Sequence, residues 1–382
     1  MKKRILQIYN SLGIGGIENI IIQLSNKVDN NCFSIFTCSL TDDYSNSKNL
    51  NDYVVFHSFN FKSSKFTGIK FLIRYPYYIF KIGKYLKRIK PDIIHIHSYN
   101  LVYLLIAISA RLYLKNVLII RTVHTSGLYY SSQSFYSKIQ IQIEKLATKI
   151  NKTIIVGISK QVFDICNNLF SKSAYQIKLI YNGINIKEFE KDYSNNESRK
   201  KYANENDFIA IYVARFDDGK NHDFLIHLWT DIIKIDNNIK LLLVGDGQNY
   251  ESAKRLVEEL NIKDYVIFTG RSYEVNKLLN ISDIALFPSG FEGFSISLLE
   301  EMASGLPVIV SDIPPFREVI SDGENGFIIP LENKKLWIGT ILKLKSSIEY
   351  RKTISKNAKL RSQCFSINNT IEQYESLYKK GL

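Results

Sequence analysis

The sequence has few cysteines and no long apolar run. Its four cysteines in 382 residues include no C-x-x-C pair, which argues against a disulfide scaffold and gives no support for a structural zinc site or a redox motif. We therefore expect a reducing compartment. The apolar stretch 101–120 is interrupted by Arg111 and Lys115, and the run 5–9 is too short for the core of a signal peptide. We expect no transmembrane helix.

Acidic residues are scarce in the first half of the chain. Residues 1–190 hold 25 Lys/Arg and 10 Asp/Glu, a net charge of +15, whereas 191–382 hold 25 and 27, a net charge of −2, which together make the +13 of the whole protein. Such one-sided charge favours an anionic partner: nucleic acid, phospholipid or a phosphorylated substrate. No recognised nucleic-acid-binding motif accompanies the charge, so we expect no nucleic-acid partner.

Short apolar runs alternate with amphipathic helical stretches along the whole chain, which is typical of βα units around parallel sheets. The length predicts two domains. Strands of the first series are predicted at 4–9, 33–38, 92–97, 117–123, 153–158 and 177–181. Strands of the second series are predicted at 208–215, 240–245, 266–269, 284–287, 308–311 and 326–329.

The polar stretch 186–206 has no apolar periodicity and is predicted to be a linker. It separates an N-terminal domain, 1–185, from a C-terminal domain, 207–365, and the helical segment 366–382 is expected to pack back on the first domain. The predicted fold class is α/β, with two doubly wound Rossmann-like domains. Because open parallel sheets bind ligands beyond the carboxyl ends of their strands, two facing sheets would place ligands in an interdomain cleft.

A glycine-rich turn, GIGG at 13–16, stands between the first predicted strand and a helix. Glycines let the backbone approach a phosphate or a sugar, and the helix N-terminus offers free N–H groups. The turn is not the G-x-G-x-x-G of dinucleotide-binding proteins, and Cys38 and Ser39 stand where their acidic residue is expected, so NAD binding is disfavoured. A tight turn without a ligand is the alternative interpretation.

Two cations, Arg215 and Lys220, follow the first predicted strand of the second series and precede a helix. Together they could hold a diphosphate and neutralise its charge as it leaves. The alternative is a solvated loop, because Asp217 and Asp218 lie between them.

The most specific motif is PSGFEGFSISLLEEMASGLPVI at 288–309. Glu292 lies in its loop, and Glu300 lies about one and a half turns into the following helix. Helical side chains lean toward the N-terminus, so Glu300 can point back toward the loop. A carboxylate there can accept hydrogen bonds from two ribose hydroxyls, while the N–H groups of the loop bind phosphate.

With these motifs the chain resembles the retaining glycosyltransferases of family four, which have the GT-B fold of two facing Rossmann-like domains. EGFSISLLE at 292–300 is similar to the E-x7-E motif of that family. Other motifs in family order are GIGGIE near the start, PDIIHIHS at 91–98, RTVHT at 121–125, ARFDDGK at 214–220, VGDG at 244–247, FTG at 268–270 and REVISDGENGFIIP at 317–330. The resemblance covers the chain.

The resemblance implies a role for each matching residue. The donor diphosphate would be bound by Arg215, Lys220, Gly15, Gly16, Phe294 and Ser295. Glu300 would bind the donor ribose, and Glu292 and Gly293 the donor sugar. His124 would lie beside the sugar at the reacting face, so Glu292 and His124 are the predicted catalytic residues.

The sequence departs from the family pattern at three positions of these motifs. Ser295 stands where the family often has Gly, Glu301 where it often has Ala, and Asn221 where Gly often follows the lysine. Ser295 lies in the sugar-contacting loop, so the donor sugar stays open. The chain has no D-x-D, the metal site of another glycosyltransferase fold. We expect no metal and no cofactor, with charge balanced by protein cations and helix dipoles.

Two histidines of the first half, His95 and His97, alternate on a predicted strand and so face one side. No Cys, Asp or Glu accompanies them, so strand packing or substrate contact is favoured over a metal site.

The segment 61–90 contains nine Lys/Arg, eight aromatic residues and no acidic residue. A basic, aromatic, amphipathic helix is typical of a membrane interface, with rings at the acyl boundary and cations on anionic headgroups. The expected membrane or acceptor contacts are Lys81, Lys84, Lys87 and Arg88. The alternative is a solvated basic face with the aromatic rings in the core.

These observations lead to a hypothesis about function. The chain would be a hexosyltransferase, peripherally bound to the cytoplasmic face of the cell membrane. It would move a sugar from a nucleotide-sugar donor, a UDP-sugar, to a lipid-linked or polysaccharide acceptor in capsule, exopolysaccharide or O-antigen assembly. The implied partners are the donor, a lipid-linked glycan and an anionic membrane surface. A GT-B nucleotide-sugar epimerase and a non-catalytic, lipid-binding protein of the same fold are the alternatives.

Overall fold

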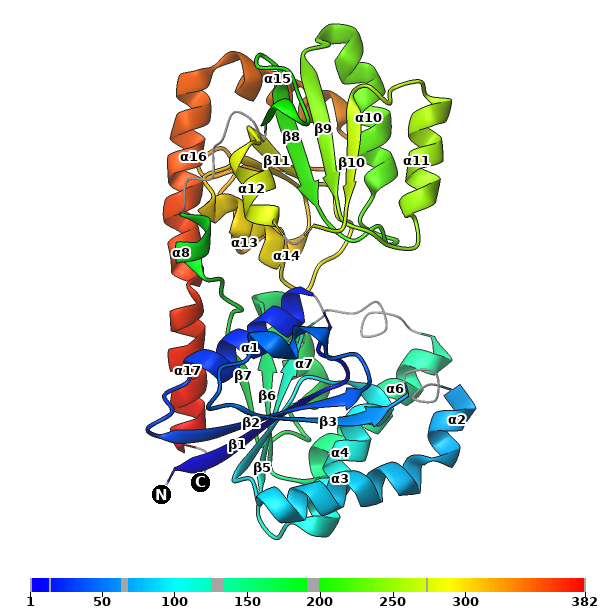
Figure 1. Ribbon diagram of the computed structural model, residues 1–382, viewed down its shortest axis with the longest axis vertical. Coiled ribbons are helices and arrows are strands. Elements are labelled where there is room, and N and C mark those ends of the chain that lie inside the picture. The colour runs from blue at the N-terminus through cyan, green and yellow to red at the C-terminus, as the bar shows by residue number, and fades with distance from the viewer. Residues whose placement is uncertain are drawn as a thin grey trace. The chain divides into compact units, whose positions relative to one another are not determined.

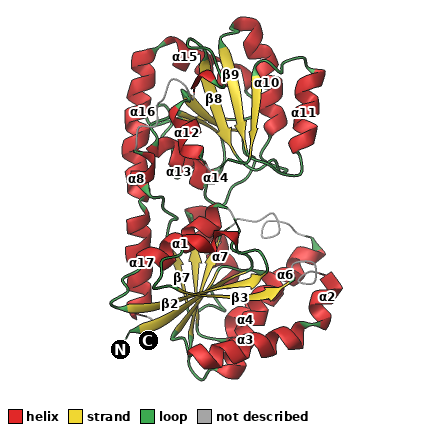
Figure 2. Cartoon of the chain, viewed as in Figure 1, coloured by secondary structure: helices red, strands yellow, loops and turns green. Residues whose placement is uncertain are grey.

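The structure, a computed structural model, describes residues 2–13, 15–62, 68–124, 134–190, 199–272 and 274–380. The chain forms two compact units (Figure 1). Unit 1 comprises 1–182 and 367–382, and unit 2 comprises 183–366. Each unit is a parallel sheet with helices packed on it (Figure 2), which is the predicted α/β class.

Unit 1 contains a seven-stranded sheet of order β3-β2-β1-β4-β5-β6-β7, and each neighbouring pair is parallel. The strand order reverses between β1 and β4, the kind of switch point at which doubly wound sheets bind ligands. The strands are β1 (Lys3–Tyr9), β2 (Phe33–Thr41), β3 (Val55–Phe61), β4 (Ile93–Ile96), β5 (Leu118–Val123), β6 (Thr153–Gly157) and β7 (Gln176–Leu179).

The helices of unit 1 cover this sheet, and α3, α4 and α6 pack side by side while α1 contacts α17. Their bounds are α1 (Gly16–Lys27), η1 (Ser45–Asn49), α2 (Gly68–Ile73), α3 (Tyr75–Ile89), α4 (Asn100–Tyr113), α6 (Phe135–Ile150), α7 (Lys160–Phe170) and α17 (Ile367–Lys380). Helix α3 buries Tyr78, Ile82 and Leu86, which recur at the spacing of one helical face.

Two details of unit 1 differ from the sequence prediction. The single helix expected near 70–89 is two helices, because Pro76 cannot continue a helix and stands instead in the first turn of α3. Strand β3 was not predicted. Its sequence alternates apolar residues with His57, Ser58 and Asn60, and it is a partly exposed edge strand, so no apolar run marks it.

Helix α17 brings the end of the chain onto the sheet of unit 1. The hydroxyl of Tyr378 lies 2.7 Å from Nδ1 of His95, and the hydroxyl of Tyr374 lies 2.8 Å from Oγ1 of Thr122. Both tyrosines are buried. Lys3 of β1 donates hydrogen bonds to the last carbonyl groups of the helix. Hydrogen bonds from two strands and one lysine therefore hold α17 to unit 1.

Unit 2 contains a six-stranded parallel sheet of order β10-β9-β8-β11-β12-β13. The strands are β8 (Phe208–Val213), β9 (Ile239–Val244), β10 (Val266–Gly270), β11 (Ile284–Phe287), β12 (Val308–Ser311) and β13 (Phe327–Ile329). The helices are α8 (Ile186–Phe189), α10 (His222–Ile235), α11 (Tyr250–Glu259), α12 (Val275–Asn280), α13 (Ile296–Ala303), α14 (Pro314–Arg317), α15 (Lys334–Ser346), α16 (Ile348–Ser362) and η3 (Gln363–Phe365).

The stretch 186–206, predicted as a linker, belongs to unit 2 in its described part. Helix α8 lies within it, and Arg199 forms a 3.0 Å ion pair with Asp283 and donates to the carbonyl of Asp207. Polar side chains fix this stretch, and apolar periodicity cannot reveal such contacts. Residues 191–198 lie outside the described residues.

The core of unit 2 contains the carboxyl group of Glu301, a residue of α13. Glu301 is fully buried, and its two oxygens have no hydrogen-bond partner among the described residues. The backbone N–H of Val213 lowers the pKa of Glu301, but by less than burial raises it. Burial first, and the neighbouring Glu300 second, raise the pKa of Glu301 well above its ordinary value. Burial therefore favours the neutral form of Glu301 in the folded chain.

We predict that Glu301→Gln makes unit 2 less sensitive to alkaline pH. A group with a raised folded pKa stabilises fully below its unfolded value of 4.5 and loses that contribution as pH rises. Between pH 5.5 and 8.5 the wild type should lose stability relative to the variant. Urea unfolding at both pH values measures this. Glu259→Gln, at an exposed position of α11, is the control. Equal pH dependence of wild type and Glu301→Gln would contradict the assignment.

Candidate active site

The candidate site of unit 2 lies where β8 and β11 end, at the switch point of the sheet. The loop 214–221 follows β8 and leads into α10, and the loop 288–295 follows β11 and leads into α13. These two loops hold every residue that the sequence predicted for unit 2 except Glu300, which lies on α13. Strand β8 ends at Val213, so Arg215 lies in the loop and not in the predicted strand.

Close backbone contacts join the two loops. The N–H of Gly290 donates to the carbonyl of Gly219 at 2.7 Å, and the side-chain amide of Asn221 donates to the carbonyl of Pro288 at 2.6 Å. Gly219 has a φ of +82°, and a Cβ there would lie 2.2 Å from the ring of Phe291. Only glycine satisfies both conditions. Asn221, where the family often has glycine, adopts the left-handed conformation and adds this amide contact.

An ion pair lies between the loops. The Nζ of Lys220 lies 2.5 Å from Oε1 of Glu292, and the two side chains are 22% and 12% exposed. The hydroxyl of Ser289 donates to the same carboxylate oxygen at 2.9 Å. The hydroxyl of Tyr212 donates to the backbone carbonyl of Lys220 at 2.9 Å. The ammonium group is therefore held in place, and its charge is balanced by one carboxylate.

The second predicted cation behaves differently. Arg215 is 76% exposed and forms a 2.9 Å ion pair with Asp217 of its own loop. The next residue, Phe216, is buried and stacks on the ring of His222 with centroids 3.8 Å apart. The structure thus brings Lys220 to Glu292, whereas the guanidinium of Arg215 lies in solvent beside its own loop, 214–221.

The loop before α13 is ordered by packing and by a cap. Phe294 is buried and packs against Phe365. The hydroxyl of Ser295 accepts a hydrogen bond from the N–H of Leu298 and so caps α13. Gly293 is the residue before Phe294 in this loop. A serine at 295, where the family often has glycine, is therefore explained by helix capping.

Glu300 presents its carboxyl group from α13 toward α8. Burial raises its pKa to about 8, and the carboxylate of Glu188 adds to the shift. Glu188 itself accepts a hydrogen bond from Asn185 at 2.6 Å. None of the hydrogen bonds among the described residues involves the carboxyl group of Glu300, so both of its oxygens are available to a ligand.

In unit 1 the predicted residues lie at the carboxyl ends of β1 and β5. Gly15 is the N-cap of α1 in an extended conformation, and Gly16 is its first residue. His124 directly follows β5, and its Nε2 lies 2.9 Å from Nδ1 of His97, which follows β4. Burial lowers the pKa of His124 to about 4, so the ring is neutral at physiological pH. Ile14 and Thr125 lie outside the described residues.

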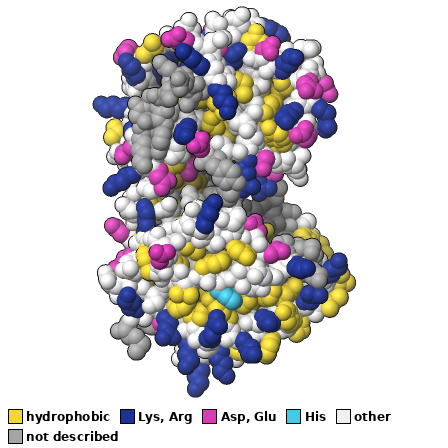
Figure 3. Space-filling model, in the orientation of Figure 1, with side chains coloured by type: hydrophobic (Ala, Val, Ile, Leu, Met, Phe, Trp, Pro, Cys, Tyr) yellow, Lys and Arg dark blue, Asp and Glu magenta, His cyan; other side chains and the backbone are white. Residues whose placement is uncertain are grey.

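The four predicted membrane contacts lie on the exposed side of α3. Lys81 lies over the ring of Tyr77, Lys84 over Phe80, and Arg88 over Tyr85. Lys87 is exposed beside them. Exposed apolar side chains accompany these cations: Ile69, Leu72, Ile73, Tyr77 and Phe80. Figure 3 shows Lys and Arg interleaved with hydrophobic side chains over this part of unit 1. Residues 63–67 of the basic segment lie outside the described residues.

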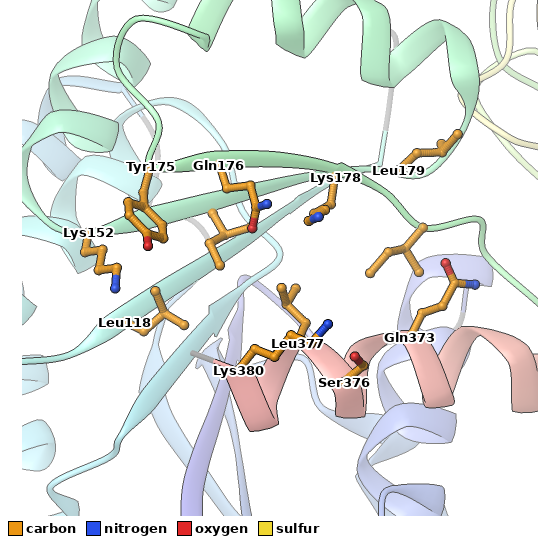
Figure 4. A pocket seen from close by; sticks show the side chains of 12 residues that line it. Leu118, Lys152, Tyr175, Gln176, Lys178, Leu179, Gln373, Ser376, Leu377 and Lys380 are labelled. Atoms are coloured by element: carbon orange, nitrogen blue, oxygen red, sulfur yellow. The ribbon is translucent and has the colours of Figure 1, made fainter. Parts of the chain in front are cut away.

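A separate hollow of about 370 Å³ lies in unit 1 between α17 and the strands β5, β6 and β7 (Figure 4). Lys152, Lys178 and Lys380 stand around it, and Leu118 and Leu377 form part of its apolar lining. The hollow extends from Leu118, the first residue of β5, to Leu179, the last residue of β7. None of the predicted site residues lines it.

Sequence reasoning missed several residues that shape these loops. Tyr212 and Ser289 orient the Lys220–Glu292 pair. Tyr212 lies in a strand outside any motif, and Ser289 lies within the motif at 288–309 but was assigned no role there. His97 was visible in the sequence, but its contact with His124 depends on the register of β4 and β5.

In the described ranges, no group of three His, Cys, Asp or Glu side chains could hold a metal ion. No described helix is both long and apolar enough to cross a bilayer.

Comparisons with known proteins agree with this geometry. The family model "Glycosyltransferase Family 4" matches residues 14–188, and "Glycosyl transferases group 1" matches residues 194–361. The chain is 26% identical over 304 residues to N-acetyl-alpha-D-glucosaminyl L-malate synthase of Bacillus anthracis, covering 78% of this chain and 77% of the relative. It is 24% identical over 308 residues to an Escherichia coli UDP-Gal:alpha-D-GlcNAc-diphosphoundecaprenol alpha-1,3-galactosyltransferase, covering 78% of each.

Among solved structures, the chain is similar to Anabaena HepE in complex with UDP and glucose. The TM-score is 0.79 at 18% identity, and the match covers 98% of this chain and 99% of HepE. Two parallel Rossmann-like sheets with this match identify the GT-B fold. Since the two family models together span nearly the whole chain, and since the motif residues converge at the strand ends, the protein belongs to the family four glycosyltransferases.

Proposed function

We propose that this glycosyltransferase moves a hexose from a UDP-sugar to a lipid-linked glycan in the assembly of a surface polysaccharide. The observation that carries the proposal is the Lys220–Glu292 pair beside the N-terminus of α13, with the free carboxyl group of Glu300 on the same helix. The printed name of the E. coli relative supports a UDP-sugar and a diphosphoundecaprenol-linked acceptor. HepE supports UDP as the nucleotide.

In the proposed reaction the bond between the sugar and the donor phosphate breaks, a bond to the acceptor oxygen forms, and the proton of the acceptor hydroxyl passes to the leaving phosphate. The leaving diphosphate gains negative charge. The ammonium of Lys220 and the N–H groups of 293–295 at the helix N-terminus would stabilise that charge. When the diphosphate takes over Lys220, Glu292 is released to contact sugar hydroxyls. Arg215 can leave Asp217 for the phosphate because it is already in solvent. No metal ion is required in this scheme.

A donor screen tests the proposal directly. The protein is incubated with a panel of sugar nucleotides and a diphosphate-linked polyprenyl glycan, with EDTA present, and products are analysed by mass spectrometry. We expect glycosylated lipid and free UDP in equal amounts. A donor that isomerises without transfer would identify an epimerase instead. Activity that EDTA abolishes and a divalent cation restores would overturn the metal-independent scheme.

We predict that Lys220→Ala weakens UDP binding. The substitution removes a charge-assisted hydrogen bond to phosphate, worth about 1.5 to 3 kcal/mol, so Kd should rise roughly 10- to 100-fold. Isothermal titration calorimetry measures this. The control is Lys254→Ala on α11, which removes a lysine that pairs with Glu251 and lies over the ring of Tyr250, away from the two loops. Unchanged affinity in Lys220→Ala, or equal weakening in the control, would contradict the role of Lys220.

We also predict that UDP binding releases a proton at neutral pH. The pKa of Glu300 near 8 keeps it protonated in the free enzyme, whereas ribose hydroxyls donating to it favour the carboxylate. The binding enthalpy at pH 7 should therefore depend on the ionisation enthalpy of the buffer, and less so at pH 9. Glu300→Gln should abolish this dependence, and Glu259→Gln should keep it. Buffer-independent enthalpies of the wild type at pH 7 would refute the prediction.

We further propose that the protein works at the cytoplasmic face of the membrane, bound peripherally through α2 and α3. The support is the exposed basic and apolar side of these helices, where Ile69 and Ile73 are each 73% exposed. Rings and aliphatic side chains would enter the acyl boundary while cations bind anionic headgroups.

Vesicle co-sedimentation checks this surface. Replacing Lys81, Lys84, Lys87 and Arg88 by Gln should lower partition to phosphatidylglycerol vesicles by about 100-fold or more, since each cation contributes about 1 kcal/mol. The matched control replaces four exposed lysines of unit 2 by Gln: Lys234, Lys254, Lys277 and Lys352. If both variants lose binding equally, net charge and not this helix surface attracts the protein.

A further inference from the structure

The two histidines that alternate at the end of β4 have different surroundings. His95 is fully buried with both ring nitrogens occupied, Nδ1 by the hydroxyl of Tyr378 and Nε2 by that of Thr122, each at 2.7 Å. These bonds join β4 to β5 and α17, so His95 is a structural residue. His97 contacts none of these hydroxyl groups. Its hydrogen-bonding partner is another histidine, His124.

The contact between His97 and His124 is close and shielded. Nδ1 of His97 lies 2.9 Å from Nε2 of His124, and the rings are stacked with an interplanar angle of 29°. Burial holds the pKa of both rings below the ordinary histidine value, so both are neutral near pH 7. The outer nitrogens, Nε2 of His97 and Nδ1 of His124, are buried and have no partner among the described residues.

Two neutral imidazoles joined by one hydrogen bond have only two arrangements. If Nδ1–H of His97 donates, His124 carries its hydrogen on Nδ1 and presents a donor there. If Nε2–H of His124 donates, its Nδ1 is a bare acceptor. In either case the hydrogen on His97 decides whether His124 offers a donor or an acceptor at its outer nitrogen.

The ring of His97 is itself fixed. Its backbone N–H donates to the carbonyl of Ile8 at 2.9 Å, and its ring packs on that of His95 with centroids 4.1 Å apart. His95 is in turn held by Tyr378 and Thr122. A ring held on one side by packing and on the other by a hydrogen bond is suited to orient its partner.

We propose that His97 is a positioning residue that sets the orientation and the tautomer of His124, and so decides whether His124 Nδ1 offers a donor or an acceptor to a ligand. The inference rests on the proposed function, together with the family resemblance that predicts His124 as a catalytic residue. His97 itself touches no substrate in this scheme. It acts through the shared proton.

Two substitutions at one position separate orientation from packing. His97→Phe keeps a ring of similar size but loses the bond to His124. His97→Asn places an amide near the former Nδ1 and can keep that bond. We expect His97→Phe to lower kcat by about 10- to 100-fold, as loss of an outer-sphere partner of a functional histidine does, with little change in donor KM. His97→Asn should recover most of the loss.

A double-mutant cycle tests whether His97 acts through His124. In a His124→Ala background, His97→Phe should cause no further loss of kcat, because the group it positions is absent. Multiplicative losses would overturn the proposal. So would a loss in His97→Phe that His97→Asn does not recover, or that follows the folded fraction seen by circular dichroism.

A spectroscopic readout is independent of turnover. Long-range 1H–15N correlation spectra report which nitrogen of His124 carries hydrogen. We expect one tautomer in the wild type and His97→Asn, and a mixture in His97→Phe. The control His227→Phe, at an exposed position of α10, should leave the spectrum of His124 unchanged. An unchanged His124 spectrum in His97→Phe would refute the positioning role. If no donor is turned over, the proposed function fails while this spectrum still tests the pair.

Discussion

Each sheet of this protein is parallel throughout, and that constraint determines where chemistry can occur. A parallel sheet covered by helices buries its strands, which is why β8 is a nearly continuous apolar run. In the first sheet His95 and Thr122 are buried within strands and hydrogen-bonded there, whereas the predicted charged groups of unit 2 lie beyond the strands, in loops and on α13. In unit 2 the two loops beside the switch point meet through Gly219 and Gly290, and this contact places Lys220 against Glu292. The site is a consequence of strand order.

Much of the architecture was predictable because it depends on local patterns. Apolar runs of four to seven residues mark most strands, and the motif at 288–309 marks the loop and helix that carry Glu292 and Glu300. The partly polar edge strand β3, the break at Pro76 and the placement of 186–206 in unit 2 were not predicted. The first lacks an apolar run, and the last depends on contacts of Arg199 with residues distant in sequence.

In the candidate sites too, local sequence patterns predicted some features, whereas others depend on contacts between distant residues. Residue identities at Lys220 and His124 could be read from motifs, whereas their partners could not. The motif at 288–309 contains Ser289 but does not show that its hydroxyl bonds Glu292, and Tyr212 lies in a strand outside any motif. The pairing of His97 with His124 requires the register of two neighbouring strands. Motifs identify reacting groups because chemistry restricts those residue types. The groups that orient them can be of many types, so only the fold reveals them.

The return of the chain to unit 1 through α17 has a consequence for synthesis. The hydroxyl groups of Tyr374 and Tyr378 satisfy Thr122 and His95 in the middle of the first sheet, yet they are encoded at the end of the chain. While the ribosome is still translating unit 2, α17 is not yet made, so His95 and Thr122 bond each other but lack the tyrosine hydroxyls, and the part of the sheet that α17 covers is open to water. Unit 1 therefore begins to form before unit 2 and is completed only after unit 2 has been translated.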